Sequence, residues 1–503
     1  MGERETLKRG MSSEAISPSR PGRDVDLPRL GYKALAIGAA LFVVYVGLRS
    51  WRLTSYGLWA DEVFSVRAAR LTWSELFRFI AADAVHPPFF YILLKLWIAA
   101  AGATLLGLKL LPLLLSVGAL APLWLLCREL KLGPAESMLA FWLIAVNGYL
   151  IHYSQELRMY SLLFCLSVWS VWLFLRFLDA AFSWRVLLSL LAVNVLLVYT
   201  HYFGWLLVGT QWICVLLWRP RLLGWFSLAL TAQAVAFAPW AYAVAGSAAK
   251  VDVVPESLQW IARPGWAEVI WYLATLNGIL PWRHTTPLGI LLFGAPIAIA
   301  LWRLFRSRRP ASGRSLAILG MLSVVPIAVS LVASRLLPQS VWGERHLMAG
   351  AVPYLVMVAG AVSYIGRGSV RMALIVLLVT WSSVAGVVGM LREEGRIPWK
   401  GLAQHMIDEE GPSHPSVKVY AFEGWTAAPL EFLFADLPDR QFDVVVTEPD
   451  LMEGARFWVV FREPTRRVQG QPRAVLERRA CRIDGERSAH DGGQRVVVFR
   501  ATC

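Results

Sequence analysis

The sequence predicts a polytopic α-helical membrane protein with about 11–13 transmembrane helices, followed by a small C-terminal α/β domain. Of its 503 residues, 57% are hydrophobic and only 17% are charged, a balance that is not typical of a soluble chain of this length. Apolar runs of membrane length recur between residues 33 and 391, separated by short polar loops. From residue 392 onward the chain is charged, and its apolar runs shorten to the length of strands.

The net charge of +14 does not indicate a nucleic-acid partner. The basic residues cluster in short loops between apolar runs, where Lys and Arg mark the cytoplasmic ends of membrane helices. The chain also contains 24 Trp, a residue that is enriched at the boundary between membrane and water. Charge and aromatic content therefore both point to membrane lipid as the surroundings of this chain.

The N-terminal segment, residues 1–32, is polar and rich in Arg, Ser and Pro. We expect it to be disordered and cytoplasmic. The first span, 33–50, then places the loop 51–107 on the extracytoplasmic side. Within that loop, the apolar run 88–107 contains Lys95, which is costly at the bilayer centre. We interpret this run as a re-entrant or surface-lying helix, because a further span there would place the basic sequence 127–131 outside.

For the rest of the membrane domain, 33–391, the charge of the loops and the alternating direction of successive spans predict the same topology. The most basic loop, 303–314, fixes its position on the inner side. The extracytoplasmic loops are then 51–107, 152–160, 246–287 and 335–346. The eleven expected spans are 33–50, 108–127, 137–153, 160–178, two within 186–218, 222–245, 288–304, 316–334, 347–365 and 372–391.

The C-terminal segment, 392–503, is predicted to be an α/β domain outside the membrane. The strand-like runs are 417–423, 442–448, 456–463 and 494–501, and the two helix candidates are 399–410 and 426–436. Cys481 and Cys503 both lie in this domain. In an oxidising compartment they could form a disulfide, and free thiols are the alternative.

The polar residues that lie near apolar runs all fall on the predicted outer face. Each has a purely structural alternative: Asp61 and Glu62 could complement a helix dipole in its first turn, and a single His such as His201 is commonly a hydrogen-bonded interface residue. Together, carboxylates, Arg and His at one membrane surface suit a reaction on an anionic, lipid-anchored substrate. The residues are Asp61, Glu62, His86, Gln155, Glu156, Arg158, His201, Tyr202, Glu344, Arg345 and His346.

Six motifs, taken in order, resemble the bacterial relatives of protein O-mannosyltransferases, which are GT-C glycosyltransferases. They are WADEVFSVRAAR (59–70), HPPFFYILLKLW (86–97), YSQELRMYSLL (153–163), YTHYFG (199–204), ERHL (344–347) and PWKGLAQHMI (398–407). The resemblance implies a GT-C membrane domain and a polyprenyl-phosphate-linked sugar donor. It also implies transfer of mannose or a similar hexose, with inversion, to a hydroxyl of a protein, lipid or glycan at the outer face of the cell inner membrane.

The resemblance also implies roles for matching residues. Asp61 would be the general base, with Glu62 beside it and His86 at the start of the next helix. Glu156 and Arg158 would share the cavity, and the donor phosphate would be held by residues from Arg158, His201, Tyr202, Arg345 and His346. The second loop has Gln155–Glu156 in place of an Asp-x-Asp pair, which leaves dependence on Mg²⁺ or Mn²⁺ open.

Two other functions need similar sequences. A transporter or flippase of lipid-linked glycans would spread polar residues through the full depth of the membrane, whereas here they gather at one interface. A polymerase or ligase of lipid-linked glycans is chemically close to the transferase, and the sequence does not separate the two.

Overall fold

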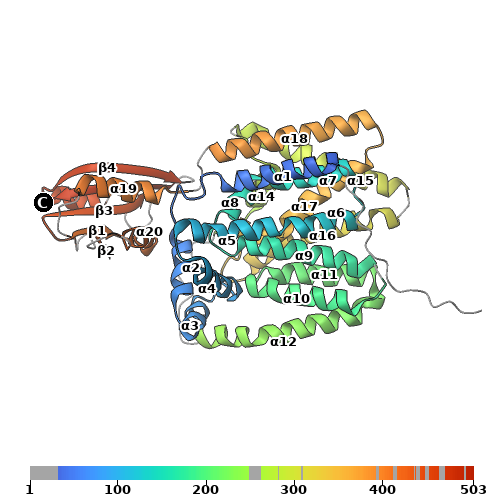
Figure 1. Ribbon diagram of the computed structural model, residues 1–503, viewed down its shortest axis with the longest axis horizontal. Coiled ribbons are helices and arrows are strands. Elements are labelled where there is room, and N and C mark those ends of the chain that lie inside the picture. Colours follow the sequence, from blue (N-terminus) through green and yellow to red (C-terminus); the bar gives the residue numbers. More distant parts are fainter. Residues whose placement is uncertain are drawn as a thin grey trace, which may run out of the picture.

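The protein consists of a long helical bundle and a small α/β domain at one end of it (Figure 1). The computed structural model describes residues 32–179, 181–248, 262–280, 282–307, 310–391, 396–411, 416–435, 437, 442–447, 452–463, 471–491 and 494–503. The predicted disordered segment therefore lies outside the described residues, except for Tyr32, and part of the predicted loop 246–287 does as well.

The α-helices of the bundle run in chain order from α1 to α18. They are α1 (Tyr32–Ser50), α2 (Ala60–Arg70), α3 (Trp73–Asp83), α4 (Phe89–Ala101), α5 (Leu105–Gly118), α6 (Leu120–Glu129), α7 (Pro134–Val146), α8 (Gly148–Ser154), α9 (Tyr160–Asp179), α10 (Trp184–Thr200), α11 (Gly204–Trp218), α12 (Leu223–Ala248), α14 (Trp266–Asn277), α15 (Thr286–Ser307), α16 (Pro310–Leu336), α17 (Met348–Ala361) and α18 (Gly368–Leu391). Among the described residues there are also four short 3₁₀ turns, η1 (Pro220–Leu222), η2 (Arg283–Thr285), η3 (Glu344–Leu347) and η4 (Val362–Tyr364).

The predicted fold class is confirmed. Within the described residues, seven helices are long and apolar enough to cross a membrane, or eight if the bent pair α7–α8 counts as one span. Three shorter apolar helices, Leu35–Ser50, α10 and α11, coincide with ranges that the sequence predicted as spans. The fourth, α4, has 13 residues and would extend only about 20 Å, less than the hydrocarbon core.

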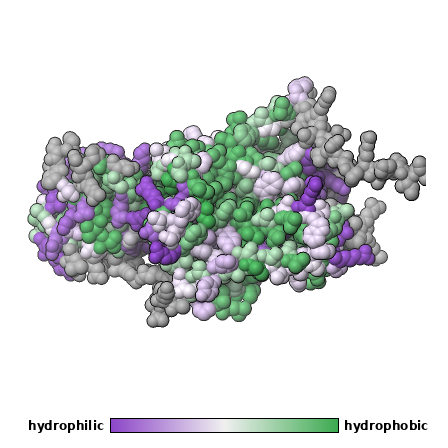
Figure 2. Space-filling model, turned by 60° about the horizontal axis from the view of Figure 1, so that its bottom comes forward, coloured by the Kyte–Doolittle hydropathy of each residue, from purple (hydrophilic) through white to green (hydrophobic). Residues whose placement is uncertain are grey.

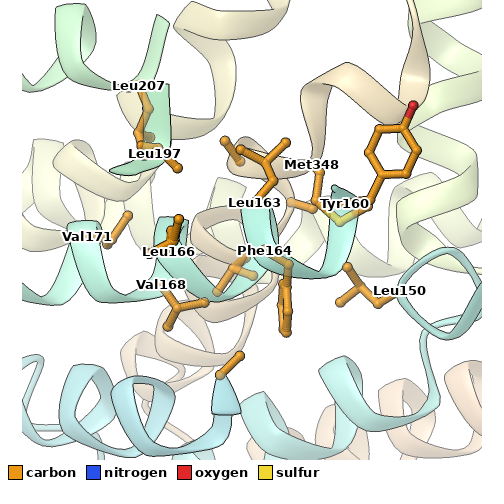
Figure 3. Packing of buried hydrophobic residues seen from close by; sticks show 14 of the residues in the cluster. Leu150, Tyr160, Leu163, Phe164, Leu166, Val168, Val171, Leu197, Leu207 and Met348 are labelled. Atoms are coloured by element: carbon orange, nitrogen blue, oxygen red, sulfur yellow. The ribbon is translucent and has the colours of Figure 1, made fainter. Parts of the chain in front are cut away.

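The outer surface of the bundle is suited to lipid. On the face shown in Figure 2, hydrophobic residues cover the middle of the bundle, and hydrophilic residues gather at its far end and over the small domain. The interior packs around α9, in which 83% of the residues in the apolar stretch are buried. Figure 3 shows Leu163, Phe164 and Val171 of this helix among side chains from α8, α10, α11 and α17.

Helices α2, α3 and α4 lie at the end of the bundle that faces the small domain (Figure 1). Local sequence explains where the first two begin. The backbone N–H of Trp59 donates to Glu62 Oε2 at 3.1 Å, and the backbone N–H of Thr72 donates to Glu75 Oε2 at 3.0 Å. Both are capping interactions that satisfy otherwise unpaired donors at a helix N-terminus.

The small domain has one five-stranded sheet in the order β2-β1-β3-β5-β4. Its strands are β1 (Val417–Ala421), β2 (Phe442–Val446), β3 (Arg456–Glu463), β4 (Arg482–Asp491) and β5 (Gln494–Thr502), and its helices are α19 (Trp399–Glu410), α20 (Gly424–Phe434) and α21 (Gln471–Arg478). The pairs β1–β2 and β1–β3 are parallel, and β3–β5 and β4–β5 are antiparallel.

The sequence predicted four of these strands and missed β4 and α21. Strand β4 reads RIDGERSAHD, which lacks a run of apolar residues because it forms the edge of the sheet and pairs only with β5. Cys481 and Cys503 form a disulfide. It joins the start of β4 to the end of β5, next to the paired residues Arg482 and Thr502.

The small domain packs directly on the outer helices of the bundle. Arg67 of α2 forms an ion pair with Glu431 of α20, and the Arg70 guanidinium lies 5.8 Å from the ring centre of Phe432. Gly57 has φ +81°, and a Cβ there would lie 3.5 Å from the backbone nitrogen of Lys400. The turn at Gly57 therefore brings the α1–α2 loop against the start of α19.

Candidate active site

Two adjoining cavities lie where loops at one end of the bundle meet the small domain. The smaller, about 190 Å³, is lined by residues of the α1–α2 loop, the α8–α9 loop, Arg345 and the small domain. The larger, about 310 Å³, extends between α8, α14 and the end of α18. Five residues line both: Tyr56, His152, Tyr153, Gln155 and Arg396. The cavities are thus separated only by a shared wall of side chains.

Asp61 and Arg345 are brought together from positions 284 residues apart in the chain. Arg345 Nη1 lies 3.5 Å from Asp61 Oδ2, and both side chains are partly exposed, at 21% and 32%. Asp61 lies in the first turn of α2, whereas Arg345 lies in η3 and lines the smaller cavity. A partly exposed carboxylate therefore lies beside a guanidinium that lines the smaller cavity.

Glu156 is the unusual carboxylate of the site. It is 6% exposed, it lines the smaller cavity, and its Oε2 has no hydrogen-bond partner among the described residues. Burial, followed by the nearby carboxylate of Glu62, raises the pKa of Glu156 to about 7. Such a group can change its charge near neutral pH, which is a common property of functional carboxylates.

The raised pKa of Glu156 predicts a pH-dependent effect of Glu156→Gln on stability. Between its unfolded value of 4.5 and its folded value of about 7, the folded state binds the proton more tightly, so stability decreases as pH rises. At pH 8 the variant should be more stable than the wild type by up to ~3 kcal/mol, and at pH 5 nearly equal to it. Thermal unfolding in detergent at both pH values measures this difference.

Glu477→Gln is the matched control, because Glu477 is exposed on α21. Its effect on the unfolding temperature should be the same at pH 5 and pH 8. If Glu156→Gln showed no difference between the two pH values either, the carboxylate would ionise normally in the folded protein.

Glu62, next to Asp61, has a fully occupied carboxylate. Its side chain is 1% exposed and forms an ion pair with Lys109 of α5, and its Oε1 accepts the backbone N–H of Leu157 at 2.6 Å. Together with the capping bond from Trp59, these contacts join α2, α5 and the α8–α9 loop. Glu62 therefore positions the loop that carries Glu156 and the helix that carries Asp61.

Arg158 also positions Asp61. Its Nη1 donates to the backbone oxygen of Asp61 at 2.9 Å, and its Nη2 lies 3.0 Å from His86 Nε2. Because a guanidinium can only donate, His86 Nε2 is the acceptor and its Nδ1–H donates to Asp83 Oδ2 at 3.1 Å. Burial and then the charge of Arg158 lower the pKa of His86 well below its usual value, which fits this neutral tautomer.

His201, Tyr202 and His346 form a separate group beside the site. The rings of His201 and His346 are 5.1 Å apart, and His201 Nδ1 accepts the backbone N–H of Phe203 at 3.1 Å. The Tyr202 hydroxyl accepts from the indole N–H of Trp240 at 3.2 Å. None of these three lines either cavity, whereas Glu156 and Arg345 line the smaller one.

Sequence reasoning missed two cations at the site, one partly buried and one buried. Arg396 Nη1 donates to Gln155 Oε1 at 2.5 Å, and its Nη2 donates to the backbone oxygen of His152 at 2.8 Å. Lys109 donates to Glu62 and to the backbone oxygen of Gln155. An isolated Lys in the apolar run 108–127, and an Arg two residues before the PWKG motif, were signals that could have identified them.

A metal site has no obvious ligands in the part of the chain that the structure describes. No group of three or more His, Cys, Asp or Glu side chains there is arranged to hold a metal ion. Of the carboxylates discussed above, Glu156 lines the smaller cavity and keeps one oxygen without a hydrogen-bond partner among the described residues.

Known proteins resemble this chain in structure but not in sequence. No family model matches the sequence, and no curated protein matches it significantly. Among solved structures, ArnT from Cupriavidus metallidurans in the apo state matches over 93% of this chain and 98% of ArnT, with a TM-score of 0.56 and 15% identity. ArnT bound to undecaprenyl phosphate matches with the same coverage, a TM-score of 0.54 and 14% identity.

The chain therefore shares its overall fold with ArnT. The archaeal oligosaccharyltransferase AglB from Archaeoglobus fulgidus is a weaker match, covering 80% of this chain and 64% of AglB with a TM-score of 0.48 and 14% identity, and a likeness at that level carries no functional argument. At these identities the likeness concerns the fold alone, so the chemistry must be argued from the site.

Proposed function

We propose that the protein is a membrane glycosyltransferase that moves a sugar from a polyprenyl-phosphate donor to an acceptor hydroxyl, with inversion. The observation that carries this proposal is the pairing of Asp61 with Arg345 at 3.5 Å. This pair would supply a base and a phosphate-binding cation side by side, on a fold shared with ArnT, whose structure was determined with undecaprenyl phosphate bound. Mannose or a similar hexose is the proposed sugar.

In this reaction Asp61 accepts the proton of the acceptor hydroxyl. The hydroxyl oxygen forms a bond to the anomeric carbon while the bond from that carbon to the phosphate oxygen breaks, and its electron pair leaves with the polyprenyl phosphate. Attack from the face opposite the phosphate inverts the anomeric centre. Arg158 holds the backbone of Asp61, and this fixed position favours proton transfer.

Arg345 supplies the positive charge for the phosphate, on which negative charge increases as it leaves. Arg396, on the wall between the two cavities, is the second cation within reach. Glu156 is less negative than an ordinary carboxylate near neutral pH because of its raised pKa, which reduces repulsion of the phosphate. The larger cavity has aliphatic residues of α18 on one side, including Val388 and Met390, and suits the polyprenyl chain.

The proposed topology places the site and the small domain outside the cell inner membrane, with the N-terminus in the cytoplasm. The basic loops at the opposite end of the spans support this orientation, and the Cys481–Cys503 disulfide is typical of an extracytoplasmic domain. Labelling of Arg128→Cys in intact cells by a membrane-impermeant maleimide would contradict it.

The experiment that tests the function uses the purified full chain in detergent with radiolabelled undecaprenyl-phosphate sugars, mannose first. Label should appear in an acceptor fraction from membranes, and free undecaprenyl phosphate should be released only when acceptor is present. Movement of the labelled lipid across reconstituted vesicles without any release would instead show a flippase. Extension of a glycan by whole lipid-linked units would show a polymerase or ligase.

A further inference from the structure

Aromatic residues of both domains line the smaller cavity, and two of its tryptophans belong to the C-terminal domain. Trp399 at the start of α19 and Trp425 of α20 line it, with Trp59 beside α2. The rings of Trp399 and Trp425 meet edge to face with centroids 5.8 Å apart. Glu156, Arg345 and Arg396 line the same cavity. An apolar aromatic surface and charged, hydrogen-bonding groups therefore share one small space.

Two buried polar atoms on residues of this cavity have no hydrogen-bond partner among the described residues. They are the indole Nε1 of Trp399 and Oε2 of Glu156. The two side chains are almost fully buried, with Trp399 1% exposed and Glu156 6%. Buried donors and acceptors in folded proteins are nearly always paired, and leaving one unpaired costs about 1–3 kcal/mol. A donor and an acceptor are thus both left for a ligand.

We infer that the smaller cavity binds a sugar ring, and that the C-terminal domain supplies the surface on which the ring lies. A pyranose has an apolar face of C–H groups, which packs against an aromatic ring, and an edge of hydroxyls, which can both donate and accept. Trp425 is the packing surface, and Trp399 Nε1 and Glu156 are the partners of the hydroxyls. Pockets of this kind combine apolar walls with a few polar groups that fix orientation.

The architecture holds this surface against the membrane domain. The backbone N–H of Lys400 donates to the carbonyl of Tyr56 at 3.4 Å, beside the close approach at Gly57. Arg462 of β3 lies over Trp425, with its guanidinium carbon 4.9 Å from the ring centre. Trp59 and Trp425 also pack against the apolar core between α19, α20 and the sheet. The aromatic wall is therefore set by two domains together.

This inference rests on the proposed transferase function, and the experiment below distinguishes failure of the sugar site from failure of that function. Saturation-transfer NMR on the full chain in nanodiscs, with methyl α-mannopyranoside and methyl β-glucopyranoside as probes, reports which sugar protons touch the protein. Ring protons should be saturated with the wild type. The signal should fall at least fivefold in Trp425→Ala and be largely retained in Trp425→Phe, because Phe keeps an aromatic surface.

Trp271→Ala is the matched control, since Trp271 lines only the larger cavity, and it should leave the sugar signal unchanged. Equal losses in Trp425→Ala and Trp271→Ala, or no loss in either, would overturn the inference. Because binding does not need the base, Asp61→Asn should keep the signal; a retained signal without any transfer by the wild type would overturn the proposed function alone.

The kinetics identify which substrate brings the sugar. With undecaprenyl-phosphate mannose as donor, Trp425→Ala should raise KM for this lipid at least fivefold if the ring belongs to the donor. A rise in KM for the acceptor alone would assign the cavity to a glycan acceptor. Unchanged KM values for both substrates would contradict a sugar site at Trp425, even if transfer itself is confirmed.

Discussion

Asp61→Asn should abolish sugar transfer while leaving the protein folded and able to bind the donor. Asn keeps the size of the side chain and can accept a hydrogen bond from Arg345, but it cannot take the proton of the acceptor hydroxyl. Loss of a general base typically lowers the rate by about 10²–10⁴-fold. The measurement is single-turnover release of radiolabelled sugar from undecaprenyl phosphate, with donor binding followed separately.

Arg345→Ala should differ from Asp61→Asn in its effect on donor binding. It removes the cation and leaves Asp61 in place, so donor affinity should fall together with the rate, by the ~1.5–3 kcal/mol expected for hydrogen bonds to a charged group. Asp408→Asn, an exposed carboxylate on α19, is the control and should transfer at the wild-type rate. Normal turnover by Asp61→Asn would show that Asp61 is not the base.

Lys109→Met should strongly destabilise the membrane domain. Lys109 forms an ion pair with Glu62, and the two side chains are 6% and 1% exposed. Removing the cation leaves a buried carboxylate without its charge partner, which typically costs about 3–5 kcal/mol. The expected result is a large decrease in unfolding temperature in detergent, together with loss of transfer, because Glu62 positions both Asp61 and the loop of Glu156.

The double variant Glu62→Gln, Lys109→Met should recover part of that stability, since no unpaired charge remains. Lys95→Met is the matched control: Lys95 is partly buried and donates to the backbone oxygens of Ala69 and Leu71, so its loss leaves no buried charge behind. Equal effects of Lys95→Met and Lys109→Met would show that the Glu62–Lys109 pair has no special energetic role.

Several features of the fold could be predicted because they depend on local sequence. The apolar runs gave the helices of the membrane domain, and α19 appeared at its predicted bounds, 399–410. The adjacent pair Asp61–Glu62 was recognised as important, yet its two members could not be told apart. Only their neighbours distinguish them. Glu62 is buried in an ion pair with Lys109, whereas Asp61 stays partly exposed beside Arg345.

By itself, the sequence determined that this is a membrane protein with a separate α/β domain, because hydropathy and strand patterns are properties of consecutive residues. The tertiary structure alone decided which polar residues meet. Arg345 approaches Asp61 across 284 residues, Arg396 reaches the wall between the cavities, and Trp425 lines the cavity of Glu156 from another domain. Such contacts depend on how helices pack and where domains dock, and neither can be predicted from patterns in consecutive residues.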